Sequence, residues 1–124
     1  MKTVILIGLA GMCGALTRYW VGGLAHRLLG SGFPWGTLTA NTLGCFFFGL
    51  VFTMAEERFL LRDQTRIILL VGFMGSFTTF SSLIFESNHL LRDAQWLLAG
   101  LNYAGQTVLG FSALWAGIFL ARLI

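Results

Sequence analysis

The chain has 124 residues, of which 56% are hydrophobic and only 10% carry a charge, with a net charge of +3. This composition excludes an ordinary soluble domain, and the mean hydropathy of +0.80 indicates an integral membrane protein. The positive charge would suggest nucleic acid in a soluble protein. Here the basic residues flank apolar runs, so we expect no nucleic-acid partner.

Four uncharged runs follow one another, each close to or beyond the roughly 20 residues that a membrane-spanning helix needs. They predict an all-α membrane protein with a single four-helix domain over residues 1–124 and spans at about 3–24, 36–54, 67–90 and 95–120. The basic residues divide only five against three between the two sides, as Lys2, Arg58, Arg62, Arg66 and Arg122 against Arg18, Arg27 and Arg92. This weak bias leaves the orientation poorly specified, which permits insertion in both directions.

The first span has three notable features. Lys2 before an apolar run resembles a signal peptide, but no soluble sequence follows Arg18, so we expect the first helix of the mature protein. Gly8, Gly11 and Gly14 recur at intervals of three and predict a packing seam. Arg18 stands about a turn before the predicted membrane exit. It either extends to the lipid headgroups or draws anions toward an entrance, and both interpretations stay open.

The second span carries an amide inside its apolar run. Asn41 is costly there unless it finds partners, so it either bonds a neighbouring helix or donates its two N–H groups to a passing anion. Thr37 lies one turn earlier on the same face. Together they predict the start of a polar track.

The third span is the least regular. Glycines and a Ser/Thr cluster occupy Gly72 to Leu83, near the middle of the apolar run, which predicts a broken helix whose free backbone groups can meet an ion. The alternative is a kinked helix whose hydroxyls bond their own carbonyls. Phe73, Phe77 and Phe80, spaced four and three apart, either face lipid or a neighbouring helix or present the positive edge of a ring to an anion. Glu86 lies deeper than a loop acid and needs a partner, for which Arg18 is a candidate.

The fourth span carries two polar pairs at helical spacing. Asn102 and Gln106 are four residues apart, as are Tyr103 and Thr107. A lipid-facing surface would not carry this set, so we expect these side chains to face protein or an aqueous path.

Three of these segments resemble one known family, the Fluc (CrcB) fluoride channels. They are the Gly36-Thr37-Leu38-Thr39-Ala40-Asn41 run, the Gly72-x-x-Gly75-x-x-Thr78-Thr79-Phe80-Ser81 pattern with Glu86, and the Gly-Ala-x-x-Arg18 pattern. The resemblance covers essentially the whole chain. It implies an antiparallel, dual-topology homodimer with two fluoride pathways and a structural sodium ion at the dimer centre.

The resemblance also assigns roles to individual residues. The backbone carbonyls of Gly75 and Thr78 from both subunits would bind Na⁺. Phe80 would turn its ring edge to fluoride and Asn41 would hydrogen-bond it. The rest of the pathway would be lined by Tyr103, Thr107, Thr37 and, near an aqueous vestibule, Arg18.

The sequence departs from the family pattern at two positions. Members usually have a second phenylalanine three residues after the first, and here that position is Leu83, which keeps the apolar wall but lacks the positive ring edge. Phe111 stands where some relatives carry serine. Some members combine two unlike chains, so a mixed dimer with a paralogous chain stays open beside the homodimer.

The leading hypothesis is a passive fluoride channel in the bacterial inner membrane that exports fluoride and protects against its toxicity. One alternative is a proton-coupled small multidrug exporter, although such exporters keep an acid in the first span and this chain has none there. Another is a non-transporting assembly subunit whose polar track only joins helices. An enzyme is not predicted, because the sequence has no nucleophile–base pair or metal-ligand cluster.

Overall fold

The computed structural model describes residues 1–124, and all of its regular elements are helices. They are α1 (Lys2–Leu29), α2 (Trp35–Glu56), α3 (Asp63–Ile67), η1 (Ile68–Met74), α4 (Gly75–Phe77), α5 (Phe80–Arg92) and α6 (Trp96–Leu123). Four stretches are long and apolar enough to cross a membrane: Lys2–Leu29, Trp35–Glu56, Asp63–Arg92 and Trp96–Leu123. The prediction of an all-α chain with four spans is confirmed. The first three stretches extend beyond both predicted bounds, and the fourth begins one residue later and ends three residues later than predicted.

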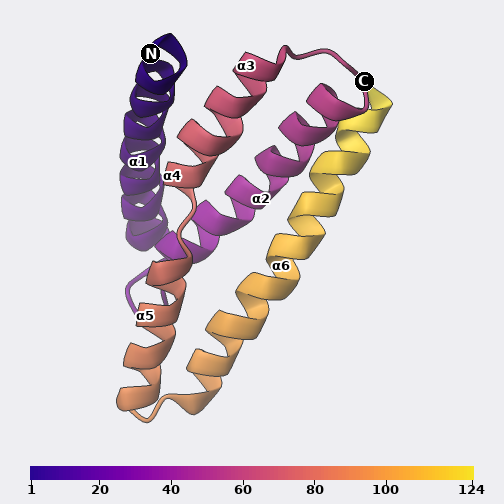
Figure 1. Ribbon diagram of the computed structural model, residues 1–124. Coiled ribbons are helices and arrows are strands. Elements are labelled where there is room, and N and C mark those ends of the chain that lie inside the picture. The colour runs from indigo at the N-terminus through magenta and orange to yellow at the C-terminus, as the bar shows by residue number, and fades with distance from the viewer.

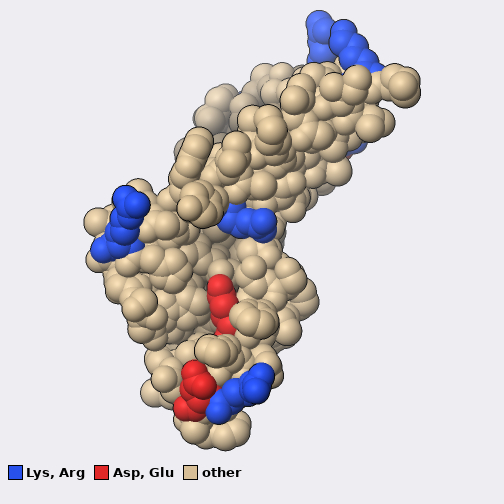
Figure 2. Space-filling model, turned by 90° about the vertical axis from the view of Figure 1, so that its left-hand side faces the viewer, with Lys and Arg blue, Asp and Glu red and all other residues tan.

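The four stretches alternate in direction. Figure 1 shows both termini at the end of the molecule where α2 connects to α3, and the turn from α5 to α6 at the opposite end. The α2 and α6 helices therefore run the same way and pack together over much of their length. Charged side chains cover little of the face in Figure 2, as expected for a chain that meets lipid.

Glycines bring the helices into close contact. A methyl group at Gly117 of α6 would stand 2.0 Å from the carbonyl oxygen of Phe46 in α2, so the two backbones approach closely only because Gly117 has no side chain. A methyl group at Gly14 of α1 would stand 2.3 Å from the carbonyl oxygen of Phe73 in η1. The predicted seam on the first span therefore forms at Gly14 and at Gly11, where a methyl group would stand 3.0 Å from Ser76 Oγ, whereas Gly8 has no neighbour within 4 Å.

The third span is interrupted near its middle. After the wide turns of η1 and the short α4, Thr78 and Thr79 are extended, with ψ angles of 158° and 109°, and α5 begins at Phe80. Figure 1 shows this extended segment between α4 and α5. The predicted break is therefore confirmed at Thr78 and Thr79.

Ion pairs join the span ends where the termini lie. Arg66 pairs with Glu56, and Arg122 donates two hydrogen bonds of 2.8 Å to the carboxylate of Glu57. These hydrogen bonds lower the pKa of Glu57 below its ordinary value, because they favour the ionised carboxylate. Two of the bases counted in the charge bias are thus paired with acids.

Candidate functional site

The Asn41 side chain holds the break in the third span. Its Oδ1 accepts a hydrogen bond of 2.8 Å from the main-chain N–H of Thr79, and its Nδ2 donates one of 3.1 Å to the carbonyl of the same residue. An amide can serve both groups because it carries a donor and an acceptor side by side. The half-buried α2 amide therefore replaces the helical hydrogen bonds that the third span loses at this point.

The break changes the bonding of two carbonyls. In a continuous helix the carbonyl of Gly75 would accept from the N–H of Thr79, which here donates to Asn41. The carbonyl of Thr78 would accept from the N–H of Ser82, which instead donates to Thr79 Oγ1 at 3.2 Å and so caps α5. Both carbonyls lose their usual helical partner, as predicted for a broken helix.

A chain of side-chain amides continues from Asn41 into the interior. Asn41 Nδ2 donates to Gln106 Oε1 at 2.8 Å, Gln106 Nε2 donates to Asn102 Oδ1 at 2.8 Å, and Asn102 Nδ2 donates to Ser87 Oγ at 3.0 Å. Asn102 is 0% exposed and Gln106 is 5% exposed. We call these four residues the amide relay. Both N–H groups of Asn41 that were expected to face an anion are therefore bonded to protein.

Sequence reasoning did not assign Asn102 and Gln106 to the site. Their spacing of four residues correctly indicated a polar helix face turned to protein. Nothing in that spacing indicated that the face meets Asn41 on α2 and Ser87 on α5. The contact depends on how three helices pack, which a one-helix pattern does not contain.

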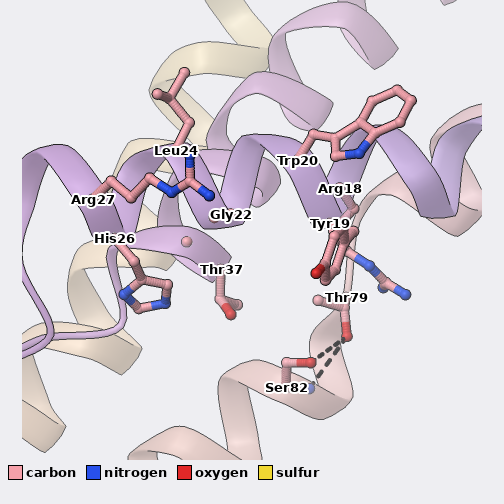
Figure 3. A pocket seen from close by; sticks show the side chains of 12 residues that line it. Arg18, Tyr19, Trp20, Gly22, Leu24, His26, Arg27, Thr37, Thr79 and Ser82 are labelled. Atoms are coloured by element: carbon pink, nitrogen blue, oxygen red, sulfur yellow. Dashed lines mark hydrogen bonds between the residues drawn. The ribbon is translucent and has the colours of Figure 1, made fainter.

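Two cavities meet at Thr79, which lines both of them. The first cavity, of about 550 Å³, includes Arg18, Thr37 and Ser82 in its wall, together with His26 and other residues of α1. Figure 3 shows the Thr79 hydroxyl directed to Ser82, with the guanidinium of Arg18 nearby on the α1 side.

The second cavity, of about 430 Å³, also has Thr79 in its wall. Its wall combines polar and apolar side chains from α2, the third span and α6, among them Asn41, Gln106, Thr107, Phe80 and Leu83. Five of the six predicted pathway residues thus share a wall with Thr79 in one cavity or the other: Arg18 and Thr37 in the first, and Asn41, Thr107 and Phe80 in the second. Phe80 has 70% of its surface exposed.

Tyr103 lies apart from these cavities. It lines a different hollow, of about 460 Å³, between α5 and α6. Its carbonyl accepts a hydrogen bond of 2.8 Å from the hydroxyl of Thr107, so the hydroxyl proton of Thr107 is already used within α6. Tyr103 therefore neighbours the second cavity only through Thr107.

The pairing considered for Glu86 and Arg18 is wrong. Glu86 Oε1 accepts a hydrogen bond of 2.5 Å from Thr37 Oγ1, whereas Arg18 Nη1 donates to the carbonyl of Thr78 at 3.3 Å. The break supplies Arg18 with a carbonyl that an unbroken helix would have used itself, and the guanidinium donates to this carbonyl.

Comparison with known proteins agrees with this architecture. Residues 5–118 match the family described as CrcB-like protein, Camphor Resistance (CrcB). The chain is 56% identical to the fluoride-specific ion channel FluC of Solidesulfovibrio magneticus, over 95% of this chain and 94% of the relative. It is 48% identical to FluC of Nitrosococcus oceani over the same shares, and 38% identical to FluC of Geobacter sulfurreducens over 98% of both chains. The chain therefore belongs to the CrcB family.

Proposed function

We propose that this chain forms a passive, fluoride-selective channel that lets fluoride leave the cytoplasm across the bacterial inner membrane. The observation that carries the proposal is the break in the third span, where Asn41 holds Thr79 between two cavities. Its relatives along the whole chain are named fluoride-specific ion channels. A channel of this kind carries out no enzymatic reaction.

The chemistry around Thr79 suits a small anion. Fluoride holds its water strongly, so a pathway must replace that water with hydrogen-bond donors at close range. Arg18 and Thr37 would line the route at the first cavity, and Asn41 and Thr107 at the second. The hydroxyls of Thr37 and Thr107 donate to Glu86 and to the Tyr103 carbonyl, so each would have to exchange this partner for the anion. Phe80 would add the positive edge of its ring, which attracts an anion without holding it as tightly as a full charge.

Tyr103 belongs to the proposed route as its continuation along α6. It precedes Thr107 by one helical turn and is 52% exposed. In the proposed pathway its ring and hydroxyl line the stretch beyond the second cavity. We also propose that the four spans form a single membrane domain, since each packs on at least one of the others.

A second copy in the opposite orientation would complete the pathway. The second cavity is open beside Phe80, whose ring is largely exposed in the single chain, so its wall needs a further surface. The weak charge bias between the two sides agrees with dual topology. We propose a homodimer, with a mixed dimer of two related chains as the alternative.

The carbonyls of Gly75 and Thr78 fit a sodium site. Neutral carbonyl oxygens are hard ligands of the kind that such cations take, and both have lost their helical partners. Thr78 accepts from Arg18 but retains a second lone pair. One chain offers too few such ligands, so the site would need both copies. Bound sodium would supply positive charge against the carbonyl dipoles, while this chain's own residues line the fluoride route.

Fluoride efflux from liposomes tests the proposal directly. The purified chain alone is reconstituted with fluoride inside, valinomycin sets the voltage, and a fluoride electrode records release. Chloride-loaded liposomes serve as the control. We expect fast fluoride loss with chloride retained, from the single chain, and slower loss when sodium is replaced by a large organic cation.

Each rival function gives a different result in this assay. Uptake of a lipophilic cation that depends on a proton gradient and is lost in Glu86→Gln would indicate an exporter. Liposomes impermeable to every ion tested would indicate an assembly subunit. Fluoride flux that appears only when a related chain is added would indicate the mixed dimer.

A further inference from the structure

An anion in the second cavity finds no free hydrogen-bond donor on Asn41. One of its N–H groups is bonded to the Thr79 carbonyl and the other to Gln106 Oε1. To bind an anion, Asn41 must therefore release one of these partners. The Thr79 carbonyl belongs to the main chain at the break, and Asn41 also accepts a hydrogen bond from the N–H of the same residue, so this carbonyl is held in place. Gln106 is the partner that can turn, because it is a side chain with rotatable bonds.

The donor-to-acceptor direction of the hydrogen bonds in the amide relay is fixed only at its Thr79 end. The Thr79 main-chain N–H can only donate, so Asn41 must face it with Oδ1 and present Nδ2 to Gln106. Gln106 then presents its oxygen to Asn41, and Asn102 presents its oxygen to Gln106. The far end is different, because the Ser87 hydroxyl can accept or donate with equal ease.

We propose that Gln106 is a second anion ligand of the second cavity, and that it turns its amide toward fluoride when fluoride arrives beside Asn41. This inference rests on the proposed function and names a residue outside the expected pathway set. In the turned state Asn41 Nδ2 and Gln106 Nε2 both donate to the anion, which lies between them. Gln106 lines the second cavity together with Asn41, so the anion can reach both.

The turned state leaves no polar group of the relay without a partner. Gln106 Oε1 now faces Asn102, which turns to donate from Nδ2, and Asn102 Oδ1 accepts from the Ser87 hydroxyl. The Gln106–Asn102 and Asn102–Ser87 contacts are kept with donor and acceptor exchanged, and the anion replaces the contact between Asn41 and Gln106. This exchange matters because Asn102 and Gln106 are buried, where an unpaired amide is costly.

The variant Gln106→Met separates this role from a merely structural one. If Gln106 only holds Asn41, its removal frees an Asn41 N–H, and fluoride flux stays the same or rises. If Gln106 is a ligand, flux falls by about tenfold or more, as expected for one hydrogen bond to a charged group. Flux equal to or above that of the unchanged protein would overturn the inference.

A second variant locks the relay without removing volume. Asn102→Asp has nearly the same shape but offers only acceptors when ionised, so Gln106 must keep its N–H groups on residue 102 and its oxygen toward Asn41. We expect fluoride flux to fall about tenfold here as well. Gln64→Glu adds the same charge at an exposed position of α3, outside the relay and all three hollows, and should leave the flux unchanged. Equal losses in both variants would overturn the inference.

A spectroscopic measurement on the unchanged protein covers the case in which these variants do not fold. The side-chain amide signals of Gln106, observed by NMR in protein labelled with ¹⁵N-glutamine, should shift on adding fluoride and not on adding chloride. Gln106 signals that do not shift on adding fluoride, in a protein that still shows fluoride efflux, would overturn the inference. A protein that carries no fluoride at all would instead overturn the proposed function.

Discussion

The two halves of the α2–α6 pair are held together by opposite means. Toward the charged end, Gly49 and Gly117 bring backbone against backbone, and a methyl group at Gly49 would stand 2.4 Å from the carbonyl oxygen of Leu114. Toward the break in the third span, the same two helices are joined by the amides of Asn41 and Gln106. The first half is fixed by excluded volume and the second by hydrogen bonds.

The two halves therefore differ in whether their contacts can change while the helices stay in place. A backbone contact has no donor or acceptor to exchange, so it can only be kept or lost. An amide contact can change partners without a change of helix position. The rigid half therefore sets the spacing of α2 and α6, and the amide half is free to respond to an ion.

The largest expected effect comes from breaking the rigid half. Gly117→Ala places a methyl group against the Phe46 carbonyl and should lower the free energy of unfolding by about 1–3 kcal/mol, the usual cost of overpacking. Gly105→Ala is the matched control on α6, because it meets nothing within 4 Å and only gains helix propensity. Thermal unfolding in detergent measures both. A Gly117→Ala protein as stable as Gly105→Ala would refute the close contact.

The next largest effect is a loss of fluoride efflux when Asn41, in the amide half, is changed. In Asn41→Asp the carboxylate can still accept from the Thr79 N–H, but it cannot donate to the Thr79 carbonyl or to Gln106, and it repels an anion. We expect fluoride efflux to fall to the level of protein-free liposomes. Undiminished efflux would argue against the assigned pathway, provided that the unfolding temperature shows a folded protein.

A smaller effect on fluoride efflux is expected from changing the aromatic rings in the wall of the second cavity. Leu83→Phe adds a ring edge beside Phe80 and should raise fluoride efflux about threefold, as expected from roughly 0.5–1 kcal/mol of ring-edge attraction. Phe80→Leu removes the existing edge and should lower the efflux. If both variants behaved like the unchanged protein, the rings would act only as apolar walls.

The smallest effect concerns the charged end next to the rigid half. Because Arg122 lowers the pKa of Glu57, the ion pair stabilises the fold above the ordinary carboxyl pKa and loses this effect as the pH falls through the lowered pKa. The pair is exposed, so salt screens it. Glu57→Gln should lower the unfolding temperature slightly at neutral pH and low salt, and not in acid. A loss that persists in acid would point to another cause.

The sequence predicts the helices well and their contacts poorly. The four apolar runs and the irregular composition around Thr78 and Thr79 predict the spans and the break directly, because both follow from local chemistry. The spans of α1 and α6 show little overall amphipathic periodicity, so hydrophobicity alone does not indicate which neighbour each face meets. For this reason Gly14 and Gly8 look alike in the sequence, yet only Gly14 lies in the seam.

The candidate site was predictable to a similar extent. Asn41, Thr107 and Phe80 were expected together and do line one cavity. The partner of Arg18 was not predictable, because a main-chain carbonyl has no sequence signature and its freedom depends on the break. The amide relay depends on three helices at once, and only its i,i+4 half on α6 is visible in the sequence.

The two hydrogen bonds between Asn41 and Thr79 have a consequence for insertion into the membrane. Neither half of the third span, residues 63–77 or 80–92, is long enough alone to cross a bilayer that needs about 20 helical residues. Between them lie main-chain groups that lipid cannot satisfy and that α2 does satisfy. The third span therefore becomes stable in the membrane only beside α2, so these two spans enter the bilayer as a cooperative pair rather than one at a time.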